Sequence, residues 1–551
     1  MPLFHKTKPI PTNTLCIIYL MEKATQRRNK PRSYTWFIPI AIYLIALAVR
    51  VIGLKFSFPL LTHHDEKIII DPLIEMSKNH TLDSGKYDRP NQFLFSVLFG
   101  YLNLLSKVLF HKNFGWAYND DPLFFYFQAR LAVAVFGATV PVLGWKIGKL
   151  FKGVDFSAAA AFLTCFYPPF VIHSHYITGD ILITALSLTV ILCCLIFLQN
   201  KKRVWIILAC ITVALTALEK YPGILSYGIV LVTLGINTFS QENKSSPKKW
   251  REFYGLILAT FFVVLLSMFI FAPHLFFKLD QVRDAFIIET RPTHLGADNL
   301  SWLGNMLFYL QVFVNAGGWI VIAFAIAGLV FSILSKQPSM LLLCFGAGYW
   351  VALSKLDLHW ERWSLPMMIT PLLLAALGFT KSWDAIKRQR WIKRFALVFL
   401  AIFALVYTLN GLTSSVLLTW RDTRVCALQF IESNGITQEN AIFEGYTPFI
   451  PRTMKTIFDF DLNNPGQKDY VILSSNIYRR YEAEPERYAT ENDFYAGLRA
   501  KATLIAEFSS SKKPENTIEQ LAVLKDYLGH LIAGTERTYT TGPTIQIYQL
   551  P

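Results

Sequence analysis

The stretch that decides the fold covers residues 62–90 and reads THHDEKIIIDPLIEMSKNHTLDSGKYDRP. It follows the first long apolar run of the chain, opens on two histidines and two acids, and closes on Lys-Tyr-Asp-Arg-Pro. Between these ends, apolar side chains recur at helical spacing, at Ile68, Ile69, Leu73 and Met76. This spacing gives a helix one apolar face. The stretch therefore predicts a helix on a membrane surface, with ionisable groups at both ends.

The composition is that of a protein that crosses a membrane many times. Of 551 residues, 53% are hydrophobic and 17% are charged, and apolar runs of about 18 residues or more recur along the chain. The formal net charge of +15 sits mainly in short links between these runs, where topology alone favours Lys and Arg. We therefore predict no nucleic-acid partner. The seven cysteines show neither metal-ligand nor disulfide spacing.

We predict eleven membrane spans. They cover residues 36–54, 125–148, 156–173, 180–198, 204–219, 222–239, 254–273, 312–334, 339–354, 364–380 and 395–417. With the amino terminus inside, the inner links carry 17 Lys or Arg, and the outer links after the first loop carry 6. The positive-inside rule therefore favours this orientation. Residues 1–35 are then an uncleaved cytoplasmic arm.

Three regions follow from this pattern: the arm 1–35, a membrane domain 36–417, and an extracytoplasmic α/β domain 418–551. Within the first external loop, 55–124, we expect a second interfacial helix near 93–110, because its aromatic and leucine residues carry few charges. In the last region we expect strands at 441–444, 470–474, 503–508 and 544–548, and helices at 424–432 and 515–527.

Four polar clusters fall on the same external side in this topology. They are the stretch 62–90, His-Ser-His-Tyr-Ile-Thr-Gly-Asp at 173–180, Glu-Lys-Tyr-Pro-Gly at 219–223, and Lys-Leu-Asp-Leu-His-Trp-Glu-Arg at 355–362. Placement by chance would divide them between the two sides. We therefore expect the four clusters to form one site.

The acids of the first cluster are the first candidates for chemistry. Asp65 and Glu66 stand where the first span ends, and Asp88 follows 23 residues after Asp65. A carboxylate at this depth can act as general base on an acceptor hydroxyl, or share a divalent cation with a second acid. The alternative is an ordinary solvated charge at a helix N-terminus.

Cations and imidazoles also gather on this side. A phosphate leaving group would suit the four cations Arg50, Arg89, Lys220 and Arg362. For any one of them alone, snorkelling to lipid headgroups is the better explanation, but it does not explain why four converge on one side. The histidines are His63, His64, His173, His175 and His359, and they lack a ligand spacing that would indicate zinc. Asp180, at the mouth of a span, is suited to orient a basic partner or a polar substrate.

The order of these motifs resembles the polyprenyl-phosphate-dependent glycosyltransferases of the GT-C superfamily. The motifs are Asp-Glu, Lys-Tyr-Asp-Arg-Pro, His-Ser-His-Tyr followed after three residues by Asp, Glu-Lys-Tyr-Pro-Gly and Glu-Arg-Trp-Ser-Leu-Pro. The chain is most similar to the bacterial branch of the dolichyl-phosphate-mannose protein mannosyltransferases, glycosyltransferase family 39, with the lipid A aminoarabinose transferases as relatives. The resemblance covers residues 36 to about 380.

The resemblance implies a role for each matching residue. Asp65 matches the catalytic base and Glu66 its partner, while Asp88 and Arg89 match the second acid and the cation near the lipid phosphate. Asp180, Lys220 and Arg362, with His64, match the substrate-binding motifs. A divalent cation (Mg, Mn or Zn) between Asp65 and Asp88 is left open. The chain departs from the family pattern at Ile68, Ile69 and Asn91, so the donor sugar is not carried over.

The sequence therefore predicts a multi-pass glycosyltransferase of the inner (plasma) membrane. It would transfer a sugar, with inversion, from a polyprenyl-phosphate donor to a protein, lipid or glycan acceptor on the extracytoplasmic face. One alternative is a lipid-linked glycan polymerase or ligase, which shares the donor chemistry. A transporter or flippase is the other, but inverted repeats or broken mid-bilayer helices, which it predicts, are not found in the sequence.

Overall fold

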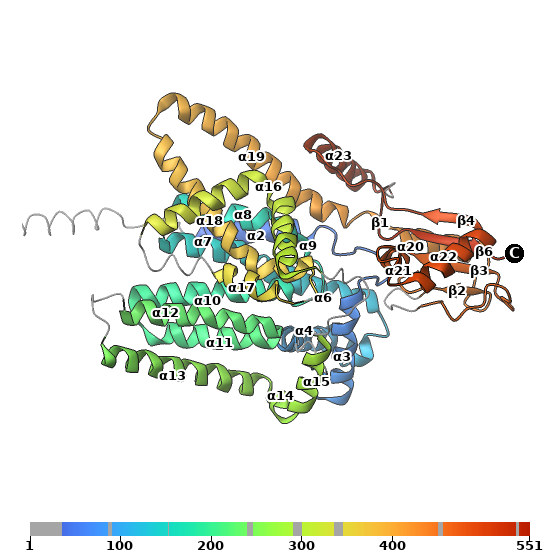
Figure 1. The fold of residues 1–551 in the computed structure, drawn as a ribbon, viewed down its shortest axis with the longest axis horizontal. Coiled ribbons are helices and arrows are strands. Elements are labelled where there is room, and N and C mark those ends of the chain that lie inside the picture. The colour runs from blue at the N-terminus through green and yellow to red at the C-terminus, as the bar shows by residue number, and fades with distance from the viewer. Residues whose placement is uncertain are drawn as a thin grey trace, which may run out of the picture.

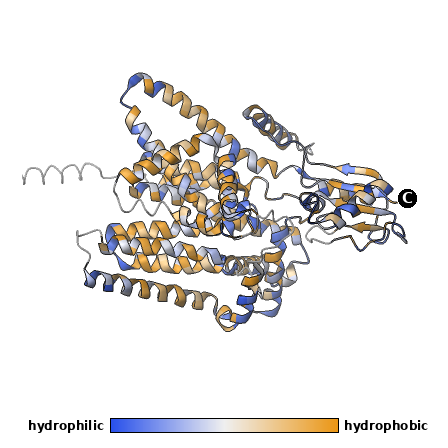
Figure 2. Cartoon of the chain, in the orientation of Figure 1, coloured by the Kyte–Doolittle hydropathy of each residue, from blue (hydrophilic) through white to orange (hydrophobic). Residues whose placement is uncertain are grey.

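The structure, a computed structural model, describes residues 36–85, 87, 91–151, 154–239, 246–289, 300–335, 345–356, 358–449, 456–535 and 539–551. Figure 1 shows a bundle of long helices that adjoins a smaller unit containing the strands. Apolar residues run along the length of the long helices, whereas the smaller unit mixes apolar and polar residues (Figure 2). The predicted fold class, a polytopic helical membrane protein with a carboxyl-terminal α/β unit, is confirmed.

The bundle is built from helices that coincide with every predicted span. They are α2 (Phe37–Val51), α6 (Pro122–Gly137), α7 (Thr139–Phe151), α8 (Val154–Phe166), α9 (Pro168–Ile172), α10 (Asp180–Asn200), α11 (Arg203–Glu219), η1 (Tyr221–Ser226), α12 (Tyr227–Phe239), α13 (Pro247–Phe271), α16 (Trp302–Leu334), α17 (Phe345–Leu353), η3 (Glu361–Ser364), α18 (Leu365–Ile386) and α19 (Arg390–Leu417). Two short helices, α14 (Pro273–Phe277) and α15 (Leu279–Glu289), follow α13.

The number of long spans differs from the prediction. Within the described residues, eight helices are long and apolar enough to cross a membrane. Seven of them coincide with predicted spans, and the eighth is α4 (Gln92–Phe110), which we expected at the interface. The other four predicted spans correspond to the shorter helices α2, α8, α11 and α17. Of these, α2 and α8 are shorter than predicted, α11 matches its prediction to within one residue, and residues 339–344 of the span at α17 lie outside the described residues.

Helix α4 is long and apolar enough to cross a membrane, but it runs in a different direction from the helices at the predicted spans. Figure 1 shows α4 end-on, while α10 to α13 lie in the plane of the picture. Leu94, Leu98 and Leu102 are buried against the bundle, and Leu104 and Val108 are exposed. Helices α3 (His64–Asn79) and α5 (Phe114–Ala117) pack beside it at the same end of the bundle. This direction and this division of its faces fit an interfacial helix.

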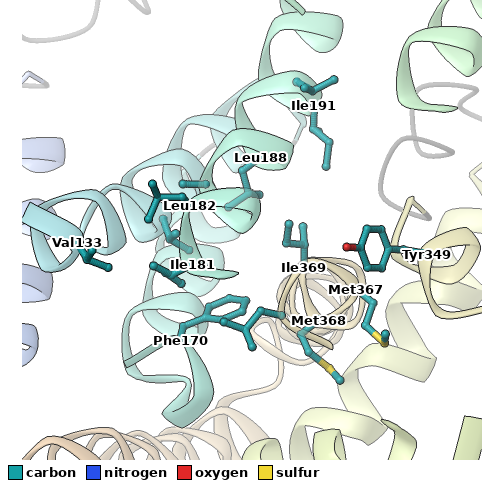
Figure 3. Packing of buried hydrophobic residues seen from close by; sticks show 14 of the residues in the cluster. Val133, Phe170, Ile181, Leu182, Leu188, Ile191, Tyr349, Met367, Met368 and Ile369 are labelled. Atoms are coloured by element: carbon teal, nitrogen blue, oxygen red, sulfur yellow. The ribbon is translucent and has the colours of Figure 1, made fainter. Parts of the chain in front are cut away.

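Helix α10 lies at the centre of the bundle. Its side chains Ile181 and Leu188 face Phe170 of α9 and Met368 of α18 in the buried core (Figure 3). Close contact, rather than removal of apolar surface from water, holds such helices together inside a bilayer. The tightest contact joins α16 and α18, where a Cβ on Gly328 would overlap the carbonyl oxygen of Leu374 and one on Gly378 that of Phe324.

The carboxyl-terminal unit is a four-stranded sheet in the order β2-β3-β6-β4. Its strands are β2 (Ala441–Phe443), β3 (Tyr470–Ser474), β4 (Thr503–Phe508) and β6 (Ile545–Gln549). β2 and β3 are parallel, and β6 pairs antiparallel with both β3 and β4. The four predicted strands are confirmed to within one or two residues.

Helices cover both faces of this sheet, because the strand residues alternate between two cores. Val471 and Leu473 pack with the residues of α21 (Ser475–Glu482) and α22 (Ala489–Lys501), while Ile472 packs with α20 (Thr423–Ser433). The sequence did not predict α21 and α22, which are polar. The pair β1 (Arg421–Asp422) and β5 (Thr540–Thr541) joins the end of the last span to the tail of the unit. Helix α23 (Thr517–Ala533) packs against α19.

Candidate active site

Two cavities meet at Asp65. The larger, about 510 Å³, lies between the bundle and the carboxyl-terminal unit, and the smaller, about 30 Å³, lies within the bundle end. Bundle residues of the larger cavity include His63, His64, Asp65, His173, Tyr176, Trp360, Glu361, Arg362 and Trp363, and its residues from the other unit include Asp422, Arg424, Tyr446, Asn476, Arg480, Thr541 and Gly542. The smaller cavity is lined by Asp65, Ile68, Ile69, Asn91, Thr178, Gly179, Asp180, Lys220 and Arg362.

Asp65 and Arg362 line both cavities and form an ion pair between them. Asp65 lies in the first turn of α3, where a negative charge is favoured by the helix dipole. Arg362 lies in η3, just before α18, and its Nη1 donates to the Asp65 Oδ2. In this arrangement the guanidinium of Arg362 occupies one oxygen of the Asp65 carboxylate.

A second ion pair stands on the other side of the smaller cavity. Lys220 Nζ lies 2.7 Å from Asp180 Oδ1, and the same ammonium lies 5.6 Å from the centre of the Trp363 ring. Asp180 begins α10, and Lys220 follows the last residue of α11. The structure therefore brings together Asp65, Asp180, Lys220 and Arg362, which come from four different sequence motifs.

Glu66 points away from both cavities. Arg130 of α6 donates two hydrogen bonds to its carboxylate, at 2.9 and 2.7 Å, and the two side chains are 0% and 1% exposed. Arg130 also donates to the carbonyl oxygens of Leu54 and Phe56, at 2.8 and 3.1 Å. The pair ties the first loop to α6, a structural role that the sequence did not predict, and the catalytic role of Glu66 stays a prediction.

Arg50 does not belong to the cationic group at the site, so that prediction was wrong. It is fully buried in the bundle, where it donates to the Ser174 hydroxyl at 3.1 Å and to the carbonyl oxygen of Cys165 at 3.3 Å. His175 is also structural, since the carbonyl oxygens of Val171 and Ile52 lie 2.8 and 2.7 Å from its two ring nitrogens. A charged or polar side chain within a bundle is kept when it is paired in this way.

Of the other imidazoles, His63, His64 and His173 line the larger cavity, whereas His359 lies against the Phe308 ring at 4.2 Å. The ring of His64 lies 5.9 Å from that of Tyr446, which belongs to the carboxyl-terminal unit. His63 stacks on Tyr176 at 4.2 Å. Burial lowers the pKa of His63 well below its usual value, and the charge of Arg362 lowers it further. His63 is therefore neutral at physiological pH and offers both a donor and an acceptor.

Asp88 and Arg89 lie outside the described residues. On either side of them, the Tyr221 hydroxyl donates to the carbonyl oxygen of Tyr87 at 2.5 Å, and the Asn91 amide donates to the carbonyl oxygen of Glu219 at 3.1 Å. Both contacts lie next to Lys220 in sequence. In the described part of the chain no group of three or more His, Cys, Asp or Glu is placed to hold a metal ion, and the Asp65 carboxylate is already paired with Arg362. The predicted cation between Asp65 and Asp88 stays a prediction, because Asp88 lies outside the described residues.

The sequence did not predict that the carboxyl-terminal unit lines one side of the larger cavity. Asn476 and Arg480 lie one turn apart on α21, Tyr446 follows β2, and none of the three belongs to a motif that the sequence indicated. Asp422 and Arg424 are paired at 2.8 Å beside them. Arg130 was missed as well, although a lone charge within an apolar run is a signal, because such a charge needs a buried partner.

Comparison with known proteins identifies the class of the chain. Residues 98–281 match the family model for dolichyl-phosphate-mannose-protein mannosyltransferase. This segment is about a third of the chain and includes Asp180 and Lys220. The chain is a membrane glycosyltransferase, as predicted. No curated protein sequence matches it.

Solved structures share its fold at low identity. The oligosaccharyltransferase AglB from Archaeoglobus fulgidus, in complex with an inhibitory peptide and a dolichol-phosphate, has a TM-score of 0.51 at 12% identity, over 94% of this chain and 89% of that one. ArnT from Cupriavidus metallidurans, bound to undecaprenyl phosphate, has a TM-score of 0.48 at 13% identity, over 94% and 98%. The likeness to AglB shows that the two proteins share the GT-C fold.

Proposed function

We propose that the chain transfers one sugar from a polyprenyl-phosphate donor to an acceptor hydroxyl or amine, with inversion, on the extracytoplasmic face. The observation that carries the proposal is the Asp65–Arg362 ion pair, which stands between a small cationic cavity and a large polar one. The matched family is named for dolichyl-phosphate-mannose, and the AglB structure is a complex with a dolichol-phosphate. Both support a donor of this kind.

The donor phosphate would lie by Lys220 and Arg362. Guanidinium and ammonium groups bind phosphate oxygens, and Arg does so with two parallel hydrogen bonds. When Arg362 turns from Asp65 to the phosphate, the carboxylate becomes available. Donor binding therefore releases the base.

The acceptor would enter from the larger cavity. Its oxygen or nitrogen attacks the anomeric carbon while Asp65 takes its proton, and the bond from that carbon to the phosphate oxygen breaks. Polyprenyl phosphate leaves with the bonding electrons, and Lys220 and Arg362 stabilise its growing charge. A positioned general base contributes about 10²- to 10⁴-fold to such a step.

The divalent cation that we considered from the sequence stays a prediction, since Asp88 lies outside the described residues. The chain's own cations supply the charge that leaving-group departure needs, so the steps above require no metal.

The test compares two aspartates of one helix. The full chain is placed in nanodiscs with the lipids and proteins of its native membrane as acceptors and is given a polyprenyl phosphate that carries a radiolabelled hexose, and transfer of label from the polyprenyl phosphate to an acceptor is followed. We expect Asp65→Asn to lower turnover by about 10²- to 10⁴-fold. Asp71→Asn, which changes an exposed α3 residue paired with Lys67 at 3.7 Å, should leave it unchanged. Normal turnover in Asp65→Asn would remove the assigned base.

The side of the membrane is tested separately by labelling intact cells with a membrane-impermeant maleimide. Ser433 and Gln389 are both exposed, the first on α20 and the second in the link before α19. We expect Ser433→Cys to react in intact cells and Gln389→Cys only after permeabilisation. The reverse pattern would put the site on the cytoplasmic face.

A further inference from the structure

Helix α23 stands apart from the sheet whose sequence surrounds it. It lies between β4 and β5 in the chain, yet it packs along the end of the last span, α19 (Figure 1). Val523, Leu524 and Tyr527 contact the residues Val416, Leu417 and Trp420. The Gln520 amide also donates to the Asn410 side-chain oxygen at 2.6 Å. One side of α23 is therefore fixed to a membrane helix.

A second side of α23 is apolar and uncovered. Its residues are Ile518, Leu521, Leu528, Leu531 and Ile532, exposed by 80%, 47%, 53%, 63% and 87%. Ile518, Leu521, Leu528 and Ile532 recur at helical spacing and form one stripe.

Lys525 is the one polar residue of α23 within the stripe, where a long cationic side chain can reach the headgroups, and Asp526 and His530 occupy a different face. Asp526 and His530 lie 3.3 Å apart, and their side chains are only 30% and 18% exposed. In a helix that faces water the polar residues would be the exposed ones. In α23 the side chains of the apolar stripe are more exposed than those of Asp526 and His530, which is the pattern of a helix in contact with lipid.

The depth of α23 agrees with this pattern. Basic residues Arg390, Lys393 and Arg394 mark the inner end of α19. The hydrocarbon core spans about 20 helical residues, so its outer edge falls near Ser414. The contacts of α23 reach from Asn410 to Trp420 on α19, so α23 lies at the level of the outer headgroups.

We infer that the apolar stripe of α23, residues 518, 521, 528 and 532, is seated in the outer leaflet of the bilayer at the headgroup boundary. Its occupant is lipid, because the stripe adjoins a span that itself exposes Val398, Ile402 and Leu405. Beyond α23 the chain reaches β5, where Thr541, and then Gly542, line the larger cavity. The helix thus fixes the carboxyl-terminal unit, and one wall of that cavity, to the membrane surface. This inference rests on the sidedness in the proposed function, but not on its chemistry.

The test measures depth with nitroxide spin labels on the full chain in nanodiscs. Cys16, Cys344 and Cys426 are replaced by serine, and Cys165, Cys193, Cys194 and Cys210 are kept because they are buried. Labels are placed one at a time at Leu521→Cys, Leu528→Cys and Ile532→Cys. Glu519→Cys reports the polar face, Leu405→Cys is the lipid reference and Ser433→Cys is the water reference.

We expect the three stripe labels to collide with oxygen as Leu405→Cys does, and with a water-soluble nickel complex at least threefold less often than Ser433→Cys. Glu519→Cys should collide with nickel several times more often than the stripe labels do. Stripe labels as open to nickel as Ser433→Cys would overturn the inference. Labels shielded from both reagents would overturn it as well, because protein and not lipid would then cover the stripe.

Discussion

Neutral substitutions of the neighbouring carboxylates Asp65 and Glu66 should have different effects, the first on turnover and the second on stability. Glu66→Gln leaves the charge of Arg130 buried without its partner, in a place where both side chains are almost completely enclosed. Removal of one partner from a buried pair costs about 3–5 kcal/mol. The change also weakens the hydrogen bond that the Ile177 amide donates to Glu66 at 3.2 Å. Glu66→Gln should therefore lower stability strongly.

The double variant Glu66→Gln with Arg130→Met is the internal control. It removes both charges and leaves neither one unpaired, so part of the lost stability should return. Arg130 also bonds the Leu54 and Phe56 carbonyl oxygens and lies 3.5 Å from the Phe56 ring centre. Because Met makes none of these hydrogen bonds, recovery should be incomplete.

The assay is thermal unfolding followed with a dye that becomes fluorescent on reaction with thiols. The four buried cysteines Cys165, Cys193, Cys194 and Cys210 lie in the bundle and react only when it opens. Asp65→Asn should keep a midpoint close to that of the native chain and lose turnover. If Glu66→Gln keeps the native midpoint and loses turnover as Asp65→Asn does, Glu66 takes part in the reaction and our reasoning fails.

Three further predictions concern other parts of the molecule. Lys220→Met should raise the KM for the polyprenyl-phosphate donor at least about tenfold, or about 1.4 kcal/mol, in a donor titration; an unchanged KM would remove Lys220 from the phosphate site. Burial raises the pKa of Glu444 to about 8 from 4.5, so the folded state binds this proton more tightly; its contribution to stability is complete below pH 4.5 and is lost as the pH rises through 8. Glu444→Gln should flatten the fall in unfolding midpoint between pH 5 and pH 8, and an unaltered slope would contradict the assignment. Gly542→Ala should destabilise by on the order of 1–3 kcal/mol, because Gly542 has φ +120° and a Cβ there would lie 2.7 Å from the Thr423 Oγ1; a native unfolding midpoint in the dye assay would contradict this.

The sequence predicted those features that depend on local pattern. Span positions follow from apolar runs, and β2, β3, β4 and β6 follow from short β-branched and aromatic segments with turn residues between them. The convergence of Asp65, Asp180, Lys220 and Arg362 followed from sidedness, because short links leave few places for polar groups to gather.

Other features depend on partners far away in the sequence. The partner of Glu66 is Arg130, 64 residues later, and a reading of one segment at a time does not join them. The wall of the larger cavity formed by Tyr446 and Arg480 requires the position of the carboxyl-terminal unit on the bundle. A helix at 515–527 was predicted, but its packing on α19 depends on a partner about 110 residues earlier in the chain.

The close passage of α16 and α18 has an effect at a distance. Arg362 stands immediately before α18, and the backbone contacts at Leu374 and Gly378 are 12 and 16 residues further along, about 18 and 24 Å deeper at 1.5 Å per residue. Pro371 interrupts the backbone hydrogen bonds of α18 between these contacts and Arg362, but residues 365–370 are buried, and a close-packed interior transmits strain. A single methyl group inserted between these helices in mid-membrane would thus displace a cation at the surface, so the geometry of the reaction is partly determined where no substrate reaches.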